Sequence, residues 1–431
     1  MGVSERPTIF LAGGGSGGHV FPLLAVAQRL QLTLPNLEAI FIGTERGLET
    51  RLVPAAGYRL ELISALPFRG VGVLGASRSL VSVAKALPRA RDLLKRYVPR
   101  AVLSIGGYAA VPMALGAKLA GIPLALMEPN SQPGLAHRLA GPGAQRVYTA
   151  FEETKKYFRA GSVLETGVAL RSGFVPRPYA WAGKGQPLRV LVLGGSQGAR
   201  SLNDLVAPAL SKAKVPLAIV HQVGRGNLLP LRQRYAELKR PGASVVEFID
   251  DMAGAIANAD LVISRAGAGA IAELCAIGRP SILVPLPISG DHQLHNAQGL
   301  EKAGGAVCLP AAAATPEALA ERVAELARDP ERLARMAESA RAWGRPDAAQ
   351  RICDDLLALA GLLTPEPAVP RLAAGEAAAA AVAGSSAGVT PAEPQPAEPK
   401  SVEAKAAEAK AAAPVEAPSE AAPVTPAGRD A

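Results

Sequence analysis

The chain has 431 residues, which is enough for two ordinary domains and a remainder. Its net charge is +9, which points to an anionic partner, but aromatic residues make up only 4% of the chain, so a nucleic-acid partner that stacks its bases on aromatic rings is not expected. The cysteines, Cys275, Cys308 and Cys353, are odd in number and have no C-x-x-C spacing, which argues against a disulfide framework and a structural zinc site.

The first half of the chain alternates apolar strand patterns with helical patterns. Glu5 and Arg6 lead straight into an apolar run, so no signal peptide is expected. Residues 108–127 are near membrane-spanning length but contain Lys118, two prolines and two glycines, so we expect a buried helix followed by a buried strand. Strands are predicted at residues 8–13, 38–43, 58–63, 101–107, 123–128 and 146–150.

The second half repeats the same alternation. Strands are predicted at residues 189–195, 217–224, 244–249, 261–267 and 281–286. Strands that alternate with helices indicate parallel sheets with helical crossovers. We therefore expect an α/β protein with two doubly wound halves joined near residue 170, and a ligand in the cleft at the carboxyl ends of the strands.

A cluster of five glycines around one serine follows the first strand, at residues 13–18. Gly13, Gly15 and Gly18 match G-x-G-x-x-G, and Glu45 follows the second strand, so a nicotinamide cofactor bound to this loop is one interpretation. More generally, such a turn lets backbone N–H groups at a helix start approach an anion or a polar sugar. A tight turn without any ligand is the alternative.

A second glycine turn, residues 194–198, matches the G-x-S-x-G pattern of serine hydrolases, with Asp291 and His292 or His295 as possible partners. The match is poor because Asp291 and His292 are adjacent in one loop, whereas the acid and base of a triad normally come from separate loops. We interpret Ser196 as a hydroxyl and backbone donor to a phosphate.

A third glycine turn lies within residues 263–285, which we interpret as a strand, the glycine turn and a helix that carries Glu273. A carboxylate about one turn above a helix start can accept both hydroxyls of a ribose whose phosphates face the N–H groups below. An ordinary surface charge is the alternative for Glu273. For His292, Gln293 and His295, in the segment 290–306, the alternative is a polar loop without a binding role.

Together these motifs resemble the MurG family in order and spacing over roughly residues 7–360. The matching segments are AGGGSGGHVFP, GGYAAVPMALGAKLAGIPLALMEPNSQPGLAHR, GGSQGARSLN, HQVGRGN, EFIDDMAGAIANADLVISRAGAGAIAE and DHQLHNAQGLEKAGGA. The family consists of bacterial transferases that add N-acetylglucosamine to undecaprenyl-pyrophosphoryl-N-acetylmuramoyl-pentapeptide, lipid I, to complete lipid II. The resemblance implies the GT-B glycosyltransferase fold, with two Rossmann-like domains facing a cleft.

The resemblance also implies a domain organisation. Residues 1–168 would form the domain on the acceptor and membrane side, residues 169–345 the domain that binds UDP-N-acetylglucosamine, and residues 346–361 a last helix that crosses back to the first domain. Residues 362–431 are rich in Ala, Pro, Glu and Lys, and cannot bury enough apolar surface to fold. This tail has a net charge of −4, so residues 1–361 carry +13.

The resemblance assigns site residues one by one. His19 is the candidate base, because a base must take the proton of the attacking hydroxyl. Glu273 is the second candidate catalytic residue. Arg171 and the N-termini of helices would stabilise the leaving diphosphate. The substrate-binding residues implied are Ser16, Gly17, Gly18, Asn130, Arg171, Ser196, Ile249, Ala268, Gly269, Ala270, Ile271, Ala272, Glu273 and Gln293. No D-x-D motif occurs, so no metal ligand is expected, and no cofactor is implied.

The chain departs from the family pattern at a few positions. Val168 and Ala169 stand where Asn-Pro is common before the nucleotide arginine, and Ala270 and Ala272 replace residues that often carry hydroxyl groups. Contacts at these two alanines are therefore expected from the backbone alone. The tail has no counterpart in the resemblance.

A membrane partner is the remaining expectation. Residues 66–100 interleave Leu, Val and Phe with basic residues, among them Arg69, Arg78, Lys85, Arg89, Arg91, Lys95 and Arg96. This pattern suits docking to anionic headgroups, although an ordinary solvated helix face would look the same. The resemblance implies that the membrane is the bacterial inner membrane, bound at its cytoplasmic face.

Four other functions remain open. They are transfer to a different lipid acceptor, epimerisation of a UDP-sugar, a nicotinamide oxidoreductase and a non-catalytic membrane scaffold.

Overall fold

The computed structural model describes most of the first 363 residues. The described ranges are 6–45, 47–64, 73–107, 109–181, 183, 185–195, 199–239, 242–286 and 291–363, and the side chains of residues 73–82 are not described. The predicted tail lies outside these ranges except for Leu362 and Leu363.

Within the described residues, the first sheet contains seven parallel strands in the order β3-β2-β1-β4-β5-β6-β7. Its strands are β1 Thr8–Gly13, β2 Glu38–Gly43, β3 Arg59–Leu62, β4 Ala101–Gly106, β5 Leu124–Glu128, β6 Arg146–Thr149 and β7 Val163–Glu165. Its helices are α1 Gly17–Thr33, α2 Glu49–Ala55, α3 Val73–Tyr97, α4 Ala110–Leu119 and α5 Leu135–Ala140. Every residue of β1, β4 and β5 is buried, as expected for central parallel strands covered on both faces.

The described residues of the second half form a sheet of six parallel strands in the order β10-β9-β8-β11-β12-β13. Its strands are β8 Leu188–Leu193, β9 Leu217–Gln222, β10 Ser244–Val246, β11 Leu261–Ser264, β12 Ser281–Leu283 and β13 Ala306–Cys308. The helices that follow are α6 Arg200–Lys212, α7 Leu228–Glu237, α8 Met252–Ala257, α9 Ala268–Ile277, α10 His292–Lys302, α11 Pro316–Arg328, α12 Pro330–Trp343 and α13 Ala348–Leu359.

The strand order reverses between β1 and β4 in the first sheet and between β8 and β11 in the second. Ligands of doubly wound sheets bind outside the carboxyl ends of the strands at such reversals. The first and second glycine turns follow β1 and β8, and the third follows β11. All three turns therefore lie where this topology places ligands.

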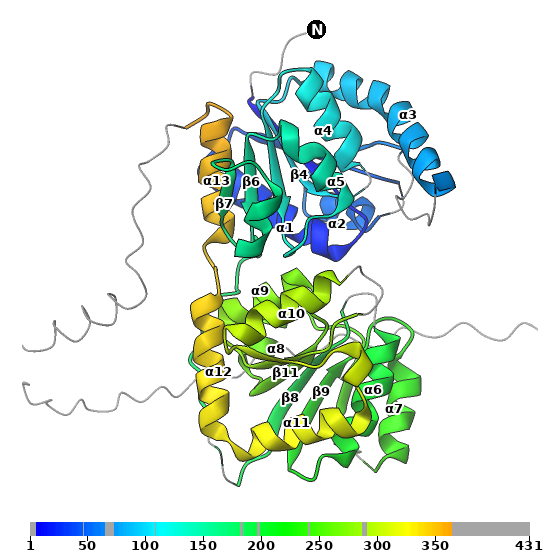
Figure 1. Cartoon of the computed structure of the whole chain (residues 1–431), viewed down its shortest axis with the longest axis vertical. Coiled ribbons are helices and arrows are strands. Elements are labelled where there is room, and N and C mark those ends of the chain that lie inside the picture. Colours follow the sequence, from blue (N-terminus) through cyan, green and yellow to red (C-terminus); the bar gives the residue numbers. More distant parts are fainter. Residues whose placement is uncertain are drawn as a thin grey trace, which may run out of the picture. The chain divides into compact units, whose positions relative to one another are not determined.

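Helix α13 packs on the first sheet, although it follows the second sheet in the chain (Figure 1). Ile352, Leu356 and Leu357 are fully buried in the same apolar cluster as residues of α1 and β1. Asp355 accepts a hydrogen bond from the Tyr148 hydroxyl at 2.9 Å and one from Arg146 Nε at 3.1 Å. The last helix thus ties the end of the described chain to the first domain.

The fold class predicted from the sequence is confirmed. All eleven predicted strands are present, and the apolar stretch 108–127 yields helix α4 and most of strand β5. The predicted boundary at 168/169 falls in the connection between β7 and β8, and the one at 345/346 falls between α12 and α13. Among the described helices, none has the length and apolar character needed to cross a membrane.

Candidate active site

The first glycine turn encloses the carboxylate of Glu49, the first residue of α2. Glu49 is 1% exposed and accepts hydrogen bonds from the backbone N–H of Gly15 at 2.7 Å and of Thr44 at 2.9 Å. A Cβ atom at Gly14 or at Gly47 would lie within 2.1 Å of a Glu49 oxygen. These glycines are therefore needed to make room for a carboxylate that joins the ends of β1 and β2.

His19 lies in the first turn of α1, just after the glycine turn, and is partly exposed. Its Nδ1 is 2.9 Å from the carbonyl oxygen of Gly14. Because a carbonyl only accepts, Nδ1 carries the hydrogen, and Nε2 is left with its lone pair. Burial lowers the pKa of His19, outweighing the bond to Gly14, so the ring stays neutral near pH 7.

A cavity of about 200 Å³ lies at the carboxyl ends of β4 and β5. Its lining brings together His19 and Asn130, both predicted from the sequence, with Glu128 and His137, which were not predicted as site residues. His292, named from the sequence only as a possible partner in the hydrolase alternative, also lines it. Gly106 and Gly107 also line it, and both have positive φ angles of 95° and 88°. Such angles favour glycine. A Cβ atom added at Gly106 would lie 3.5 Å from the His137 ring, and one added at Gly107 would lie 3.5 Å from His19 Nδ1.

Glu128 and His137 form a buried pair in the wall of this cavity. Each side chain is 3% exposed, and His137 Nδ1 is 2.7 Å from Glu128 Oε2. The other ring nitrogen, Nε2, is buried and has no hydrogen-bond partner among the described residues. Burial alone would raise the pKa of Glu128. The adjacent His137 ring and the hydrogen bonds from Asn130 outweigh burial and hold this pKa below its usual value.

Asn130 is held by hydrogen bonds with Glu128 and Asn296. Its backbone N–H and its side-chain amide both donate to Glu128 Oε1, at 3.0 and 3.2 Å. Its side-chain oxygen accepts from Asn296 of α10 at 3.3 Å. The residue that the resemblance assigns to the sugar is thus fixed by groups from both domains.

The second glycine turn is described only in part. Gly195 has a φ of 77°, and α6 begins at Arg200, but Ser196 lies outside the described residues. Beside this turn, Arg265 at the end of β11 donates to the Ser201 hydroxyl and to the carbonyl of Val284. A cation therefore stands beside the start of α6, where the resemblance expects the pyrophosphate.

The segment Ala268–Glu273 forms the first turns of α9. Ala268, Ile271 and Ala272 are at most 9% exposed and pack in apolar clusters, so their side chains face the core. Gly269, Ala270 and Glu273 are only partly buried. Spacings of three and four place these last residues on one face of the helix, which is the face open to a ligand.

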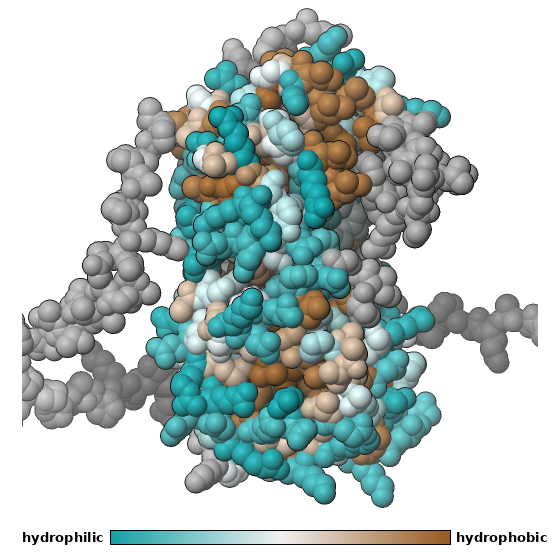
Figure 2. All heavy atoms as spheres, in the orientation of Figure 1, coloured by the Kyte–Doolittle hydropathy of each residue, from teal (hydrophilic) through white to brown (hydrophobic). Residues whose placement is uncertain are grey.

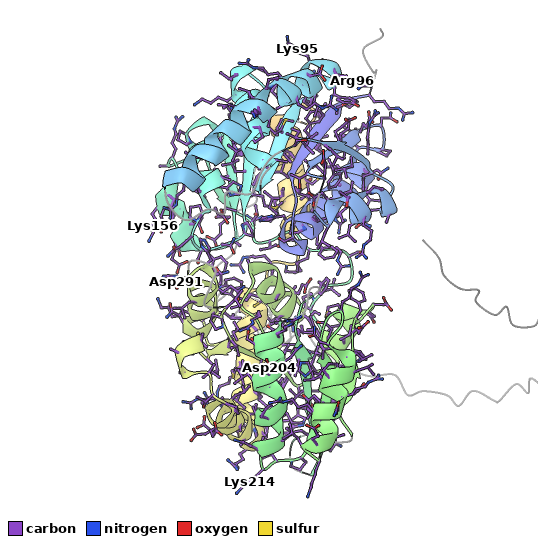
Figure 3. The ribbon with its side chains drawn as sticks, turned by 90° about the vertical axis from the view of Figure 1, so that its right-hand side faces the viewer. Lys95, Arg96, Lys156, Asp204, Lys214 and Asp291 are labelled. Atoms are coloured by element: carbon purple, nitrogen blue, oxygen red, sulfur yellow. The ribbon has the colours of Figure 1, made fainter. Side chains whose placement is uncertain are left out.

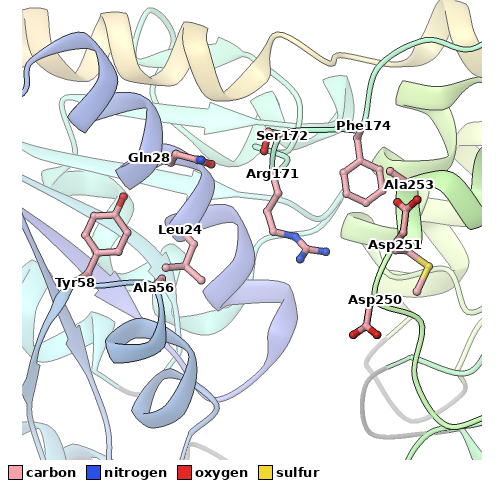
Figure 4. A pocket seen from close by; sticks show the side chains of 11 residues that line it. Leu24, Gln28, Ala56, Tyr58, Arg171, Ser172, Phe174, Asp250, Asp251 and Ala253 are labelled. Carbon is pink, nitrogen blue, oxygen red and sulfur yellow. The ribbon is translucent and has the colours of Figure 1, made fainter. Parts of the chain in front are cut away.

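The charge of Arg171, in the connection between β7 and β8, acts on the Glu273 carboxyl of α9. Burial raises the pKa of Glu273 to about 7, and the positive charge of Arg171 opposes that rise. The Arg171 guanidinium lies 4.6 Å from the ring centre of Phe21 of α1. It extends into a second cavity of about 350 Å³, which Asp250 and Asp251 line from the side of α8 (Figure 4).

The other predicted contacts are placed as follows. Ser16 precedes α1 and is exposed, and Gly17 and Gly18 form the start of that helix. Ile249 follows β10 and packs partly against the core of the second domain. Gln293 lies in the first turn of α10, where its side-chain oxygen accepts from the N–H of Leu286 at 3.0 Å.

Two of the alternative interpretations fit this geometry poorly. His295 Nδ1 contacts the backbone carbonyl of Asp291 at 2.8 Å and not its carboxylate, so a hydrolase dyad is not assembled there. Glu45 accepts from the Ser64 hydroxyl, and the N–H of Gly15 already binds Glu49. The first turn therefore lacks the free Gly15 donor that a dinucleotide phosphate would use.

Two profiles of glycosyltransferase family 28 match the chain. The N-terminal domain of the family matches residues 9–149, and the C-terminal domain matches residues 189–352. A relative from Sorangium cellulosum strain So ce56 is 47% identical over 360 residues, which are 82% of this chain and 88% of the relative. It is named UDP-N-acetylglucosamine--N-acetylmuramyl-(pentapeptide) pyrophosphoryl-undecaprenol N-acetylglucosamine transferase. The chain belongs to the MurG family.

Solved structures agree with this assignment. The crystal structure of Acinetobacter baumannii MurG is 32% identical, with a TM-score of 0.69 over 81% of this chain and 99% of that one. A UDP-GlcNAc 2-epimerase from Neisseria meningitidis has a TM-score of 0.59 over 82% of this chain and 100% of its own, at 14% identity. At that identity the epimerase shares the fold alone with this MurG-family chain.

Proposed function

We propose that this chain transfers N-acetylglucosamine from UDP-N-acetylglucosamine to the 4-hydroxyl of the muramoyl sugar of lipid I. The product is lipid II, the lipid-linked disaccharide of peptidoglycan synthesis. The observation that carries the proposal is the 47% identity to a relative named for this reaction, over 82% of the chain. No metal and no cofactor take part in the proposed step.

His19 is the proposed base. The lone pair on Nε2 accepts the proton of the attacking 4-hydroxyl, whose oxygen forms the new bond to the anomeric carbon. The bond from that carbon to the UDP oxygen breaks on the opposite face, so an α-linked donor gives a β-1,4 product. The neutral state of His19 near pH 7 supports this role.

The donor nucleotide is proposed to lie along α9 and the second glycine turn. The partly open face of α9 offers backbone N–H groups to the diphosphate and the Glu273 carboxylate to the ribose hydroxyls. Arg171 supplies positive charge beside Glu273, and Arg265 supplies it beside α6. These cations stabilise the negative charge that develops on the leaving UDP.

The chain is also proposed to dock on an anionic membrane through its first domain, at the cytoplasmic face of the inner membrane. In the predicted segment 66–100, residues 66–72 lie outside the described residues, and α3 places Lys85, Arg91 and Lys95 at the surface. Figure 3 shows Lys95 and Arg96 at the end of α3. Arg89 instead forms ion pairs with Glu61 and Asp92, which leaves it less available to lipid.

Apolar side chains next to this segment support the docking proposal. α4 and α5 pack against each other and expose four leucines by 39–57%: Leu115, Leu119, Leu135 and Leu139. Figure 2 shows apolar surface in the region of these two helices. Lys118 and Arg138 are exposed on the same helices. Apolar and basic groups side by side match the interface between acyl chains and anionic headgroups.

Release of UDP from UDP-N-acetylglucosamine in EDTA tests the proposal. Release is expected with a short-chain lipid I analogue and not without it or with diacylglycerol. Release with diacylglycerol alone would assign a different lipid acceptor. Conversion of the donor to its 2-epimer in the absence of any acceptor would assign the epimerase function.

A further inference from the structure

Asn296 of α10 is fully buried and forms hydrogen bonds with two other segments of the chain. Its side-chain oxygen accepts from the backbone N–H of Ser131 at 3.1 Å and from the Ser131 hydroxyl at 3.0 Å. Its side-chain nitrogen lies 3.3 Å from both the Asn130 side-chain oxygen and the backbone carbonyl of Ala266. One amide therefore joins the loop after β5 to the loop after β11.

The chemistry of the partners fixes the orientation of this amide. The N–H of Ser131 can only donate, so the oxygen of Asn296 must face it. The carbonyl of Ala266 can only accept, so the NH₂ group must face that side. With two bonds accepted and two donated, every hydrogen-bonding position of the Asn296 side chain is used.

The network continues into the candidate active site in both directions. On one side Asn130 connects to Glu128, and Glu128 connects to His137 in the wall of the cavity that also holds His19. On the other side Ala266 lies two residues before α9, the helix that carries Glu273. A path of hydrogen bonds, completed by the short backbone segment from Ala266 to α9, therefore links the proposed acceptor side to the proposed donor side.

We propose that Asn296 is a positioning residue that holds the acceptor-side loop, residues 128–134, in register with the donor-binding helix α9. The inference rests on the proposed function and adds a residue that acts on the reaction without touching substrate. A buried amide bound to two loops restricts both of them. Removing it lets the 4-hydroxyl and the anomeric carbon move apart, and a displacement of about 1 Å costs on the order of 100-fold in rate.

Two substitutions and one control separate positioning from stability. Asn296→Ala removes all four hydrogen bonds, whereas Asn296→Asp keeps an oxygen toward Ser131 and loses the NH₂ group that faces Asn130 and Ala266. The control is Gln132→Ala. The Gln132 amide also joins the loop after β5 to α10, through a contact of 3.3 Å with the His295 ring, but this contact is exposed to solvent. Melting temperatures of all variants show whether the fold is retained.

Steady-state kinetics with a short-chain lipid I analogue give the first readout. Both Asn296 variants are expected to lower kcat/KM for the acceptor by about 10- to 100-fold, with the Kd for UDP-N-acetylglucosamine changed by less than about twofold. Gln132→Ala is expected to match the wild type. The double variant Ser131→Ala/Asn296→Ala is expected to lose less kcat/KM than the sum of the two single variants, because each single change already removes the same hydrogen bond between the two side chains.

Near-normal acceptor kinetics in Asn296→Ala, a parallel loss of donor affinity, or additive costs in the double variant would each overturn the proposal. Hydrogen exchange of the Ser131 amide gives a readout that needs no substrate. Exchange should be at least about 10-fold faster in Asn296→Ala, because Asn296 Oδ1 is the acceptor of that N–H. If the wild type shows no acceptor-dependent UDP release, the proposed function is wrong, whatever the role of Asn296. Unchanged exchange of the Ser131 amide in Asn296→Ala would instead show that Asn296 does not hold this loop.

Discussion

Binding of UDP-N-acetylglucosamine should expel a proton from Glu273. In the free protein, burial raises the pKa of Glu273 from 4.5 to about 7, and Arg171 offsets only part of this effect. Ribose hydroxyls that donate to the carboxylate stabilise its charged form, so the bound donor lowers that pKa. The protein therefore releases a proton when the donor binds.

The pKa of about 7 sets the magnitude. At pH 7 the free Glu273 carries about half a proton, so donor binding should release about 0.5 proton for each chain. The proton must be removed before the donor binds, so affinity falls as the pH falls below 7. For a bound pKa well under 6, the Kd at pH 6 should be about 10-fold weaker than at pH 8.

Isothermal titration calorimetry in two buffers with different ionisation enthalpies measures the released protons directly. The diphosphate of UDP-N-acetylglucosamine is a diester and does not titrate between pH 6 and pH 8, so the protons come from the protein. Glu273→Gln is the matched control, because it cannot titrate. Equal enthalpies in both buffers for the wild type, or a proton release that persists in Glu273→Gln, would refute the reasoning.

Four further predictions concern catalysis, stability and the membrane. His19→Ala should lower kcat by about 100- to 10,000-fold at saturating substrates while calorimetry shows an unchanged donor Kd, and near-normal turnover would remove His19 as the base. The raised pKa of Glu273 destabilises the folded wild type at pH values above 4.5, the ordinary pKa of the carboxyl. Glu273→Gln should therefore raise the free energy of unfolding by about 1–3 kcal/mol at pH 8 and by nothing below about pH 4.5, which urea titrations at the two pH values can contradict. Asp355→Ala should lower the free energy of unfolding by about 1–3 kcal/mol because the Tyr148 hydroxyl loses its buried partner, and an unchanged urea midpoint would exclude this role for α13. Charge reversal at Lys85, Arg91 and Lys95 should weaken binding to anionic vesicles and leave binding to neutral vesicles unchanged in co-sedimentation, so equal binding to anionic vesicles would disprove docking through α3.

The sheets could be predicted because central parallel strands are continuous apolar runs. Strands such as β1 and β8 stand out in the sequence for this reason. The two strands that were missed, β7 and β13, have three residues each and pair on one side only at a sheet edge. Short edge strands need no apolar run, so their sequences carry little signal.

The glycine turns and His19 could also be placed from the sequence, because turn chemistry is local. Long-range partners could not. Glu49 reads as an ordinary surface charge until the fold places it 2.7 Å from the N–H of Gly15, 34 residues away. Glu128 lies within a motif that the sequence already singled out, but only the turn into α5 brings His137 to it.

The structure of the lipid product tests the central claim most directly. Wild-type protein incubated with UDP-N-acetylglucosamine and a short-chain lipid I analogue should give one lipid-linked disaccharide, with a β-1,4 linkage by NMR and one equivalent of UDP. An α-linked product, a sugar attached at another hydroxyl, or UDP released without any disaccharide lipid would contradict the account.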